Sequence, residues 1–342
     1  MKLMKTLCAA ALAAGLATGA GAEIYRLQTS QNAGDFTLQY LQNVWVPRLT
    51  AMSGGEIELE LLPINSVVPA AEGLDAVSMG ILDGFHDAVS RSTGKDPAFG
   101  MFADMVAAYD NPDQGQTMCM NAGGKAFLQK LVDKYSDNMV HVVGCAPYTR
   151  ESLPSAVPIR GVADLKGLKV RAPEGLPAEL FSRAGATSVP IPFSEVYTSL
   201  EKGIIDAADA SAYVNNHATG LHKVAPYPIQ PGIHSQAILY LTFNKDVWDA
   251  FTPAQQEMIN TWYMAALPDL RRYSNLEDYK IIAKDRAGGT DVKEIIDWSP
   301  EDRAKFREIA KSVWEDYAKL SPLAQEAYEV QVQYLRDAGL LE

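Results

Sequence analysis

The residue best suited to bind a ligand in this sequence is an arginine at the end of a short expected strand. Residues 164–173 read D-L-K-G-L-K-V-R-A-P, where an Asp-Leu-x-Gly turn leads into a strand that ends at Arg171. An arginine at the carboxyl end of a parallel strand faces the crevice in which α/β proteins bind ligands. Its planar guanidinium holds a carboxylate by two parallel hydrogen bonds, which lysine cannot do. The alternative is a surface arginine paired with a neighbouring Asp or Glu.

Signatures of catalysis are missing from the sequence. It contains no GxGxxG after the first expected strand, no GxxxxGK[ST], no GxSxG and no HExxH. The five histidines show no metal-binding spacing, since His217 and His222 are one residue too far apart for a zinc pair on one helix face. No nucleophile is paired with a base. This pattern favours a binding protein over an enzyme, and no cofactor is expected.

The elements that must position Arg171 alternate between strand and helix. A strand is expected at 23–29, a helix at 35–53 and a strand at 56–62, and the alternation continues to residue 202. Such a pattern predicts α/β architecture with mainly parallel sheets covered by helices. From about residue 250 nearly everything is expected to be helical. Because no long linker separates the two α/β halves, chain crossings must join them, as in hinged proteins with a cleft.

The N-terminus has the three parts of a secretory signal peptide. Lys2 and Lys5 precede an apolar run over 7–16, and Ala20-Gly21-Ala22 supplies a small-x-small cleavage site. Residues 1–22 are therefore expected to be removed in the periplasm. The alternative is an N-terminal membrane anchor, for which the apolar run is too short. No later stretch approaches a transmembrane length, so the mature chain is not expected to insert in the membrane.

The charge and the cysteines restrict the partners and the redox state. The net charge of −12 becomes −14 without the two leader lysines, and no Lys/Arg cluster offsets it, so a nucleic-acid partner is not expected. Cys119 and Cys145 remain after the leader is removed. In an α/β unit a helix start and the end of the following strand lie at the same sheet edge, so a disulfide is reachable. Two buried free thiols are the alternative.

Long motifs make the sequence resemble a known family. They are the run at 164–173, V-P-I-P-F-S-E-V-Y-T-S-L-E-K-G-I-I-D-A-A at 189–208 and N-K-D-V-W-D-A-F-T-P-A-Q-Q at 244–256. Together they resemble the solute-binding subunit of TRAP (tripartite ATP-independent periplasmic) transporters, the C4-dicarboxylate-binding or DctP family. G-K-D-P-A-F-G at 94–100 resembles the subgroup that binds 2-oxo acids.

The resemblance implies a type II-like, two-domain periplasmic binding protein with a hinged cleft and a helical C-terminal region. Domain I is expected to hold residues 23–147 plus about 237–276. Domain II is expected to hold 148–236 plus about 277–342. The implied partners are a small organic acid and the small and large TRAP membrane subunits.

The resemblance also assigns residues to the ligand site. Arg171 matches the family arginine that forms a bidentate salt bridge with the ligand carboxylate. Arg150 falls where many relatives have a second arginine and the oxo-acid subgroup has glutamine, or else it is a rim residue paired with Glu151 or Glu174. Phe193 resembles the aromatic wall beside the ligand, with a staple at the start of a helix as the alternative.

The sequence departs from its relatives after residue 206. The oxo-acid subgroup has D-A-A-E-W here, whose Glu and Trp help to hold a cation beside the substrate, whereas this chain has Asp209 followed by Ala210. A metal therefore stays open. Asp209 could bind a ligand hydroxyl, help to hold a cation, or pair with Arg150. Asn215 could recognise a ligand hydroxyl or cap a loop.

Five further residues complete the expected site. His234 lies where the chain returns to the first domain and could donate to a hydroxyl or keto oxygen, or be a satisfied buried histidine. His86 and Asp87 end a first-domain strand at a position that closes over the ligand. Tyr148 and Tyr213 could line the cavity with rings.

The expected ligand is a monocarboxylate with a hydroxyl, keto or ring substituent, favoured over a C4-dicarboxylate or a sugar acid. Loss of the Trp beside Asp209 leaves room for something larger than pyruvate. A ligand-sensing receptor and a periplasmic enzyme on the same scaffold are the competing functions.

Overall fold

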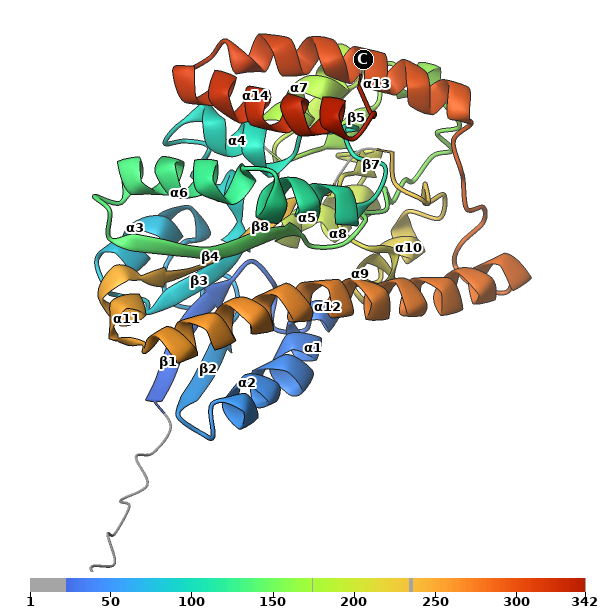
Figure 1. Ribbon diagram of the computed structural model, residues 1–342. Helices are drawn as coiled ribbons and strands as arrows, with labels where there is room; N and C mark the ends of the chain where they lie inside the picture. The colour runs from blue at the N-terminus through green and yellow to red at the C-terminus, as the bar shows by residue number, and fades with distance from the viewer. Residues whose placement is uncertain (1–22, 174, 234–235, 342) are drawn as a thin grey trace, which may run out of the picture.

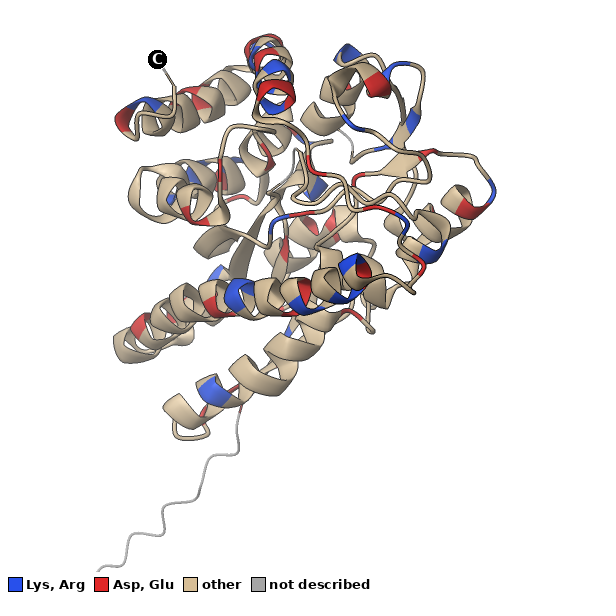
Figure 2. Ribbon diagram, turned by 90° about the vertical axis from the view of Figure 1, so that its right-hand side faces the viewer, with Lys and Arg blue, Asp and Glu red and all other residues tan. Residues whose placement is uncertain are grey.

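The computed structural model describes residues 23–173, 175–233 and 236–341, so the expected signal peptide lies outside the described residues. The strands form two sheets, and helices pack around both (Figure 1). The α/β class and the helical C-terminal region predicted from the sequence are confirmed. Figure 2 shows acidic and basic residues interspersed along the helices. Ion pairs within helices include Arg183–Glu179 and Lys311–Glu308.

The first sheet has five strands in the order β2-β1-β3-β8-β4. β1 runs parallel to β2 and β3, but β8 is antiparallel to both of its neighbours. The sheet is thus mixed, whereas the sequence predicted mainly parallel sheets. The chain enters β8 after crossing back from the second sheet, and every residue of this interior strand is buried. The strands are β1 Glu23–Thr29, β2 Ile57–Leu62, β3 Gly84–Ala88, β4 Val140–Pro147 and β8 Ile238–Asn244.

The second sheet is small and parallel throughout. Its order is β6-β5-β7, with β5 in the centre. Isolated bridges such as Ser152 to Ser211 and Leu153 to Ile229 join the crossing segments beside it. The elements of this half are β5 Lys169–Arg171, α7 Leu176–Arg183, β6 Thr187–Val189, α8 Val196–Glu201, β7 Ala207–Ala208, α9 Tyr213–Ala218 and α10 Leu221–Val224.

Helices cover the first sheet. The helix expected at 35–53 begins at the N-cap Asp35, contains one π-helical turn over Leu41–Trp45, and ends before Gly54 and Gly55. Both glycines have positive φ, of 66° and 88°, a conformation that side chains with a Cβ disfavour. The helices of this half are α1 Phe36–Tyr40, α2 Val46–Met52, α3 Gly73–Ser78, α4 Pro97–Ala103, α5 Pro112–Asn121, α6 Gly124–Tyr135 and α11 Lys245–Ala250.

One long helix, α12, reaches both halves. It spans Pro253–Ala287, 35 residues, and a capping box between Thr252 and Gln255 starts it as the sequence predicted. At 1.5 Å per residue such a helix is about 50 Å long. It packs against β4 and α2 near its start and against α9 near its end (Figure 1). α12 therefore links the first sheet to the segment that follows β7.

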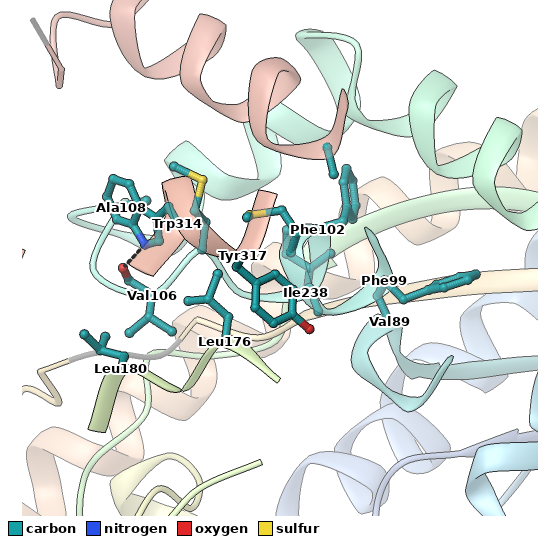
Figure 3. Close-up of a cluster of buried hydrophobic side chains, with 14 of the residues drawn as sticks. Val89, Phe99, Phe102, Val106, Ala108, Leu176, Leu180, Ile238, Trp314 and Tyr317 are labelled. Carbon is teal, nitrogen blue, oxygen red and sulfur yellow. Dashed lines mark hydrogen bonds between the residues drawn. The ribbon is translucent and has the colours of Figure 1, made fainter. Parts of the chain in front are cut away.

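The C-terminal helices pack on the other side of the molecule. α13 (Pro300–Ala318) contacts α7 and α4, while α14 (Pro322–Asp337) contacts α4 and α6. Trp314 and Tyr317 of α13 enter a buried cluster with Phe102 and Leu176, and the Trp314 indole donates to the Val106 carbonyl at 3.0 Å (Figure 3). These helices touch elements of both expected domains. The domain bounds given above remain a proposal.

Cys119 of α5 and Cys145 of β4 form a disulfide, with their Cα atoms 5.9 Å apart. Of the two alternatives left open by the sequence, the structure has the bridge. Both cysteines are fully buried, and the bond joins the helix to the edge strand of the first sheet.

Candidate ligand-binding site

Arg171 ends β5, the central strand of the small sheet. Its Nε donates to the Ile191 carbonyl at 3.2 Å and its Nη1 to the Asp209 carbonyl at 2.5 Å. The Asp209 amide in turn donates to the Arg171 carbonyl at 2.8 Å. Backbone from the ends of both neighbouring strands therefore fixes the orientation of the guanidinium.

The same contacts leave most of the guanidinium available. Of its five N–H groups, the two carbonyls use one on Nε and one on Nη1. Nη2 donates to no residue that the structure describes. One N–H group on Nη1 and two on Nη2 remain, and an arginine can hold both oxygens of a carboxylate through these two nitrogens.

Burial and charges of both signs act on the pKa of Arg171. Burial lowers the pKa of Arg171, while Asp209 and Glu151 raise it and Arg91 lowers it. A partly buried cation is costly unless an opposite charge compensates it. Phe193 lies beside it, with the Arg171 Cζ 5.9 Å from the ring centroid, and begins the 3₁₀ turn Phe193–Glu195. Phe193 thus borders the arginine and begins a helical turn, and its expected place beside a ligand stays a prediction.

Arg150 has different surroundings. It is half-buried and makes no hydrogen bond or ion pair with any residue in the described part of the chain, Glu151 included. Burial lowers its pKa, and the charges that act on it most are those of Arg303, Asp297 and Asp110. None of these is among the charges that act most on Arg171. The two arginines thus have different charged neighbours, and the expected role of Arg150 beside Arg171 stays a prediction.

Arg91 is a cation near Arg171 that the sequence reasoning missed. It lies in the 3₁₀ turn Val89–Ser92 after β3, is 41 % exposed, and its Nε is 3.7 Å from a carboxylate oxygen of Asp87. Burial raises the pKa of Asp87 to about 6, which Arg91 opposes. The i, i+4 spacing of an acid and an arginine just after a strand was the signal available in the sequence.

His86 is buried in β3, the strand between β1 and β8. Burial lowers its pKa to about 4, so the ring is neutral at pH 7. Its edge faces the Tyr263 ring at 5.8 Å between centroids. The expected role of His86 over the ligand stays a prediction.

Tyr148 and Asn215 come together with a residue that the sequence reasoning did not single out, Asp35. The Tyr148 hydroxyl and the Asn215 amide both lie within reach of the Asp35 carboxylate and lower its pKa, although burial raises that pKa overall. Asn215 also donates to the Ser211 hydroxyl at 3.0 Å. Asp35 follows β1 at the carboxyl end of a parallel strand, and this position was the signal available in the sequence.

Tyr213 is fully buried and its hydroxyl donates to Asp285 of α12 at 2.7 Å. Its ring packs on His222, with 4.4 Å between centroids. The side chain thus holds α9 on α12, and its expected role in lining the cavity stays a prediction. His234 lies outside the described residues.

Two surface concavities lie elsewhere. One of about 670 Å³ is lined by Cys119, Lys125 and His141 among others, and one of about 1000 Å³ lies along α2 and β2. Neither contains a residue of the expected site. Among the residues that the structure describes, no group of three or more His, Cys, Asp or Glu side chains could hold a metal ion.

Comparison with known proteins gives the family. The model of the DctP family, described as bacterial extracellular solute-binding protein family 7, matches residues 28–320. The chain belongs to this family. A TRAP periplasmic solute-binding protein from Rhodobacter sphaeroides, solved as an apo open structure, is similar with a TM-score of 0.78. It is 39 % identical, and the match covers 93 % of this chain and 99 % of that one.

Two relatives carry names that state a ligand. The monocarboxylate 2-oxoacid-binding periplasmic protein of Nostoc sp. is 28 % identical over 82 % of this chain and 76 % of its own. The ectoine/5-hydroxyectoine-binding periplasmic protein of Ruegeria pomeroyi is 23 % identical over 89 % of both chains. The fold of this chain has two α/β halves, and Arg171 lies on the smaller sheet. No helix in the described part of this DctP-family chain is long and apolar enough to cross a membrane.

Proposed function

We propose that this protein captures a small organic carboxylate in the periplasm and delivers it to the small and large membrane subunits of a TRAP transporter. The observation that carries the proposal is the Arg171 guanidinium, which two backbone carbonyls orient while its Nη1 and Nη2 donors stay available. Membership of the DctP family supports the transport role. The N-terminal leader pattern supports export.

Arg171 does not act as a general acid or base, because an arginine stays charged in proteins even when burial lowers its pKa. Selectivity for acids follows from the cost of leaving a desolvated guanidinium without a counter-charge. Closure of the two halves over the ligand would complete that desolvation and bring both domain surfaces into register for the membrane subunits. The protein works as a carrier and not as an enzyme.

The ligand we favour is a monocarboxylate with a hydroxyl, keto or ring substituent. The name of the Nostoc relative supports a 2-oxo acid, and that of the Ruegeria relative adds ectoine and 5-hydroxyectoine to the candidates. Asn215 and Tyr148 add polar groups that a plain alkyl acid would leave unmatched.

A thermal-shift screen tests this proposal. The panel holds hydroxy, keto and aromatic monocarboxylates, the dicarboxylates succinate, malate and fumarate, and sugars and amines without a carboxylate. A ligand at 100 times its Kd stabilises the fold by about 2.7 kcal/mol, which is a clear shift in melting temperature. We expect monocarboxylates to give the largest shifts. Shifts with dicarboxylates alone would contradict the ligand class, and shifts with the neutral or cationic compounds alone would contradict the role of Arg171.

A further inference from the structure

Asp35 brings a carboxylate to the contact between the two halves of the molecule. It is the N-cap of α1, where one of its oxygens accepts the Thr37 amide at 3.0 Å. Helix α1 of the first half packs against α9 of the second half. Asp35 therefore lies where elements of both halves meet, beyond the carboxyl end of β1.

The side chains that most affect the pKa of this carboxylate are uncharged. They are Thr37, Asn215 and Tyr148. Burial raises the pKa of Asp35, which means that desolvation of the charged form is incompletely compensated. A donor brought by a ligand would supply part of the missing compensation.

Polar atoms around Asp35 also lack partners. Tyr148 is 9 % exposed and Asn215 is 3 % exposed, and both approach the carboxylate. Yet the Tyr148 hydroxyl oxygen and the Asn215 Oδ1 are buried and complete no hydrogen bond of good geometry with any described residue. The hydroxyl of the next residue, Thr149, is also buried and has no hydrogen-bond partner among the described residues. Buried polar groups without partners are rare because each costs about 1–3 kcal/mol.

A short path connects this group to Arg171. Asn215 donates to Ser211, and Ser211 follows Asp209 by two residues, whose backbone is bonded to Arg171. The Asp35 group and the guanidinium therefore both contact the segment 209–215, Asp35 through Asn215 and Arg171 through the Asp209 backbone.

We infer that Asp35, Tyr148 and Asn215 form a second polar subsite of the ligand cavity. This subsite recognises a hydrogen-bond donor, a hydroxyl or a protonated amine, at the end of the ligand opposite the carboxylate that Arg171 holds. The inference rests on the proposed function. It narrows the substrate class to acids that carry a remote donor.

Calorimetric titration with matched acids tests the subsite. The probes are 4-hydroxybenzoate against benzoate, and 6-hydroxyhexanoate and 6-aminohexanoate against hexanoate. The wild type is expected to bind the donor-bearing member of at least one pair about tenfold more tightly. Asp35→Asn keeps the helix cap, since Asn caps as well as Asp, and is expected to lose that preference. Glu60→Gln, the same type of change at an exposed position of β2, is expected to keep it.

Two further measurements separate the possible results. Tyr148→Phe removes a single hydroxyl and is expected to reduce the preference, so the subsite can be judged even if Asp35→Asn does not fold. Equal affinities within every pair, or a preference that survives both substitutions, would overturn the subsite. If Arg171→Lys weakens binding of all the acids while no donor preference exists, the subsite fails and the proposed function stands. If none of the acids binds, or if binding is indifferent to Arg171, the proposed function itself fails.

Discussion

Arg171 and Arg150 show what can and cannot be predicted from residue type and local sequence. The turn motif and the strand end predicted where Arg171 lies, because both are local features of the chain. The prediction that the Arg150 guanidinium also binds the ligand depended on how two distant segments of the chain approach each other. In the structure the two arginines have different charged neighbours. Arg91 and Asp35 were missed for the same reason. Each lies just after a first-half strand, and its closeness to the second half follows from tertiary contacts.

The paired N–H donors of the Arg171 guanidinium can be tested by a substitution that keeps the charge. Arg171→Lys keeps the charge but removes the paired donors, so we expect the best acid of the screen to bind at least about tenfold more weakly, about 1.4 kcal/mol. Calorimetric titration measures the change. Arg183→Lys is the matched control, since Arg183 is exposed and pairs with Glu179 and Asp316 on the surface. Unchanged affinity of Arg171→Lys would remove Arg171 from the site.

Helix α12 anchors the short helix that carries Asn215. Asp278 of α12 accepts the Val214 amide at 2.7 Å, and Asp285 accepts the Tyr213 hydroxyl at the same distance. Both carboxylates are buried. The capping box and the start of α12 were predictable from Thr252-Pro253. The contact with α9 was not, because buried acids on an otherwise charged helix look like solvent-exposed residues in a sequence.

Asp278 makes stability depend on pH. Burial raises its pKa from 3.8 to about 7, so the folded protein holds a proton that the unfolded chain releases between about pH 4 and pH 7. The free energy of unfolding therefore falls as the pH rises through that window and levels off above it. Asp278→Asn keeps an acceptor for the Val214 amide and removes the titration. We expect its melting temperature to fall less between pH 5 and pH 8 than that of the wild type, by roughly 2 °C or more. Glu60→Gln should follow the wild type, and identical pH profiles for Asp278→Asn and the wild type would refute the assignment.

The disulfide between α5 and β4 closes a loop with a sequence separation of 26 residues. Crosslinks over loops of this size stabilise proteins by about 3–4 kcal/mol in the chain-entropy model. Protein recovered from the periplasm after removal of residues 1–22, and denatured without reductant, is expected to show no reactive thiol. The Cys119→Ala, Cys145→Ala double variant is expected to melt several degrees lower. Two titratable thiols in the wild type would contradict the bridge.

The strand pattern predicted the class of the fold better than the direction of its strands. β8 is a mostly apolar, fully buried run, ILYLTFN. Such a run does not distinguish a parallel strand from an antiparallel one. Its insertion between β3 and β4 depends on the chain returning from the second half. Local periodicity therefore predicts the helices and strands. The return of the chain from the second half determines the order of the strands in the first sheet.

At the scale of the whole molecule, an acidic protein that binds an acid needs a local cation. The chain carries a formal net charge of −12, so long-range attraction does not favour an anionic ligand. Capture then depends on Arg171 and on its desolvation as the halves close. The two sheets, the shared helix α12 and the C-terminal helices provide the frame for that closure.

The most direct test of this account compares an acid with its own amide. The best acid of the screen and the corresponding carboxamide have nearly the same shape, but only the acid offers a charge to Arg171. Calorimetric titration of the wild type at pH 7.5 is expected to show that the carboxamide binds at least about tenfold more weakly than the acid. Equal affinity of the acid and its carboxamide would contradict the claim that this protein selects its ligand by a carboxylate.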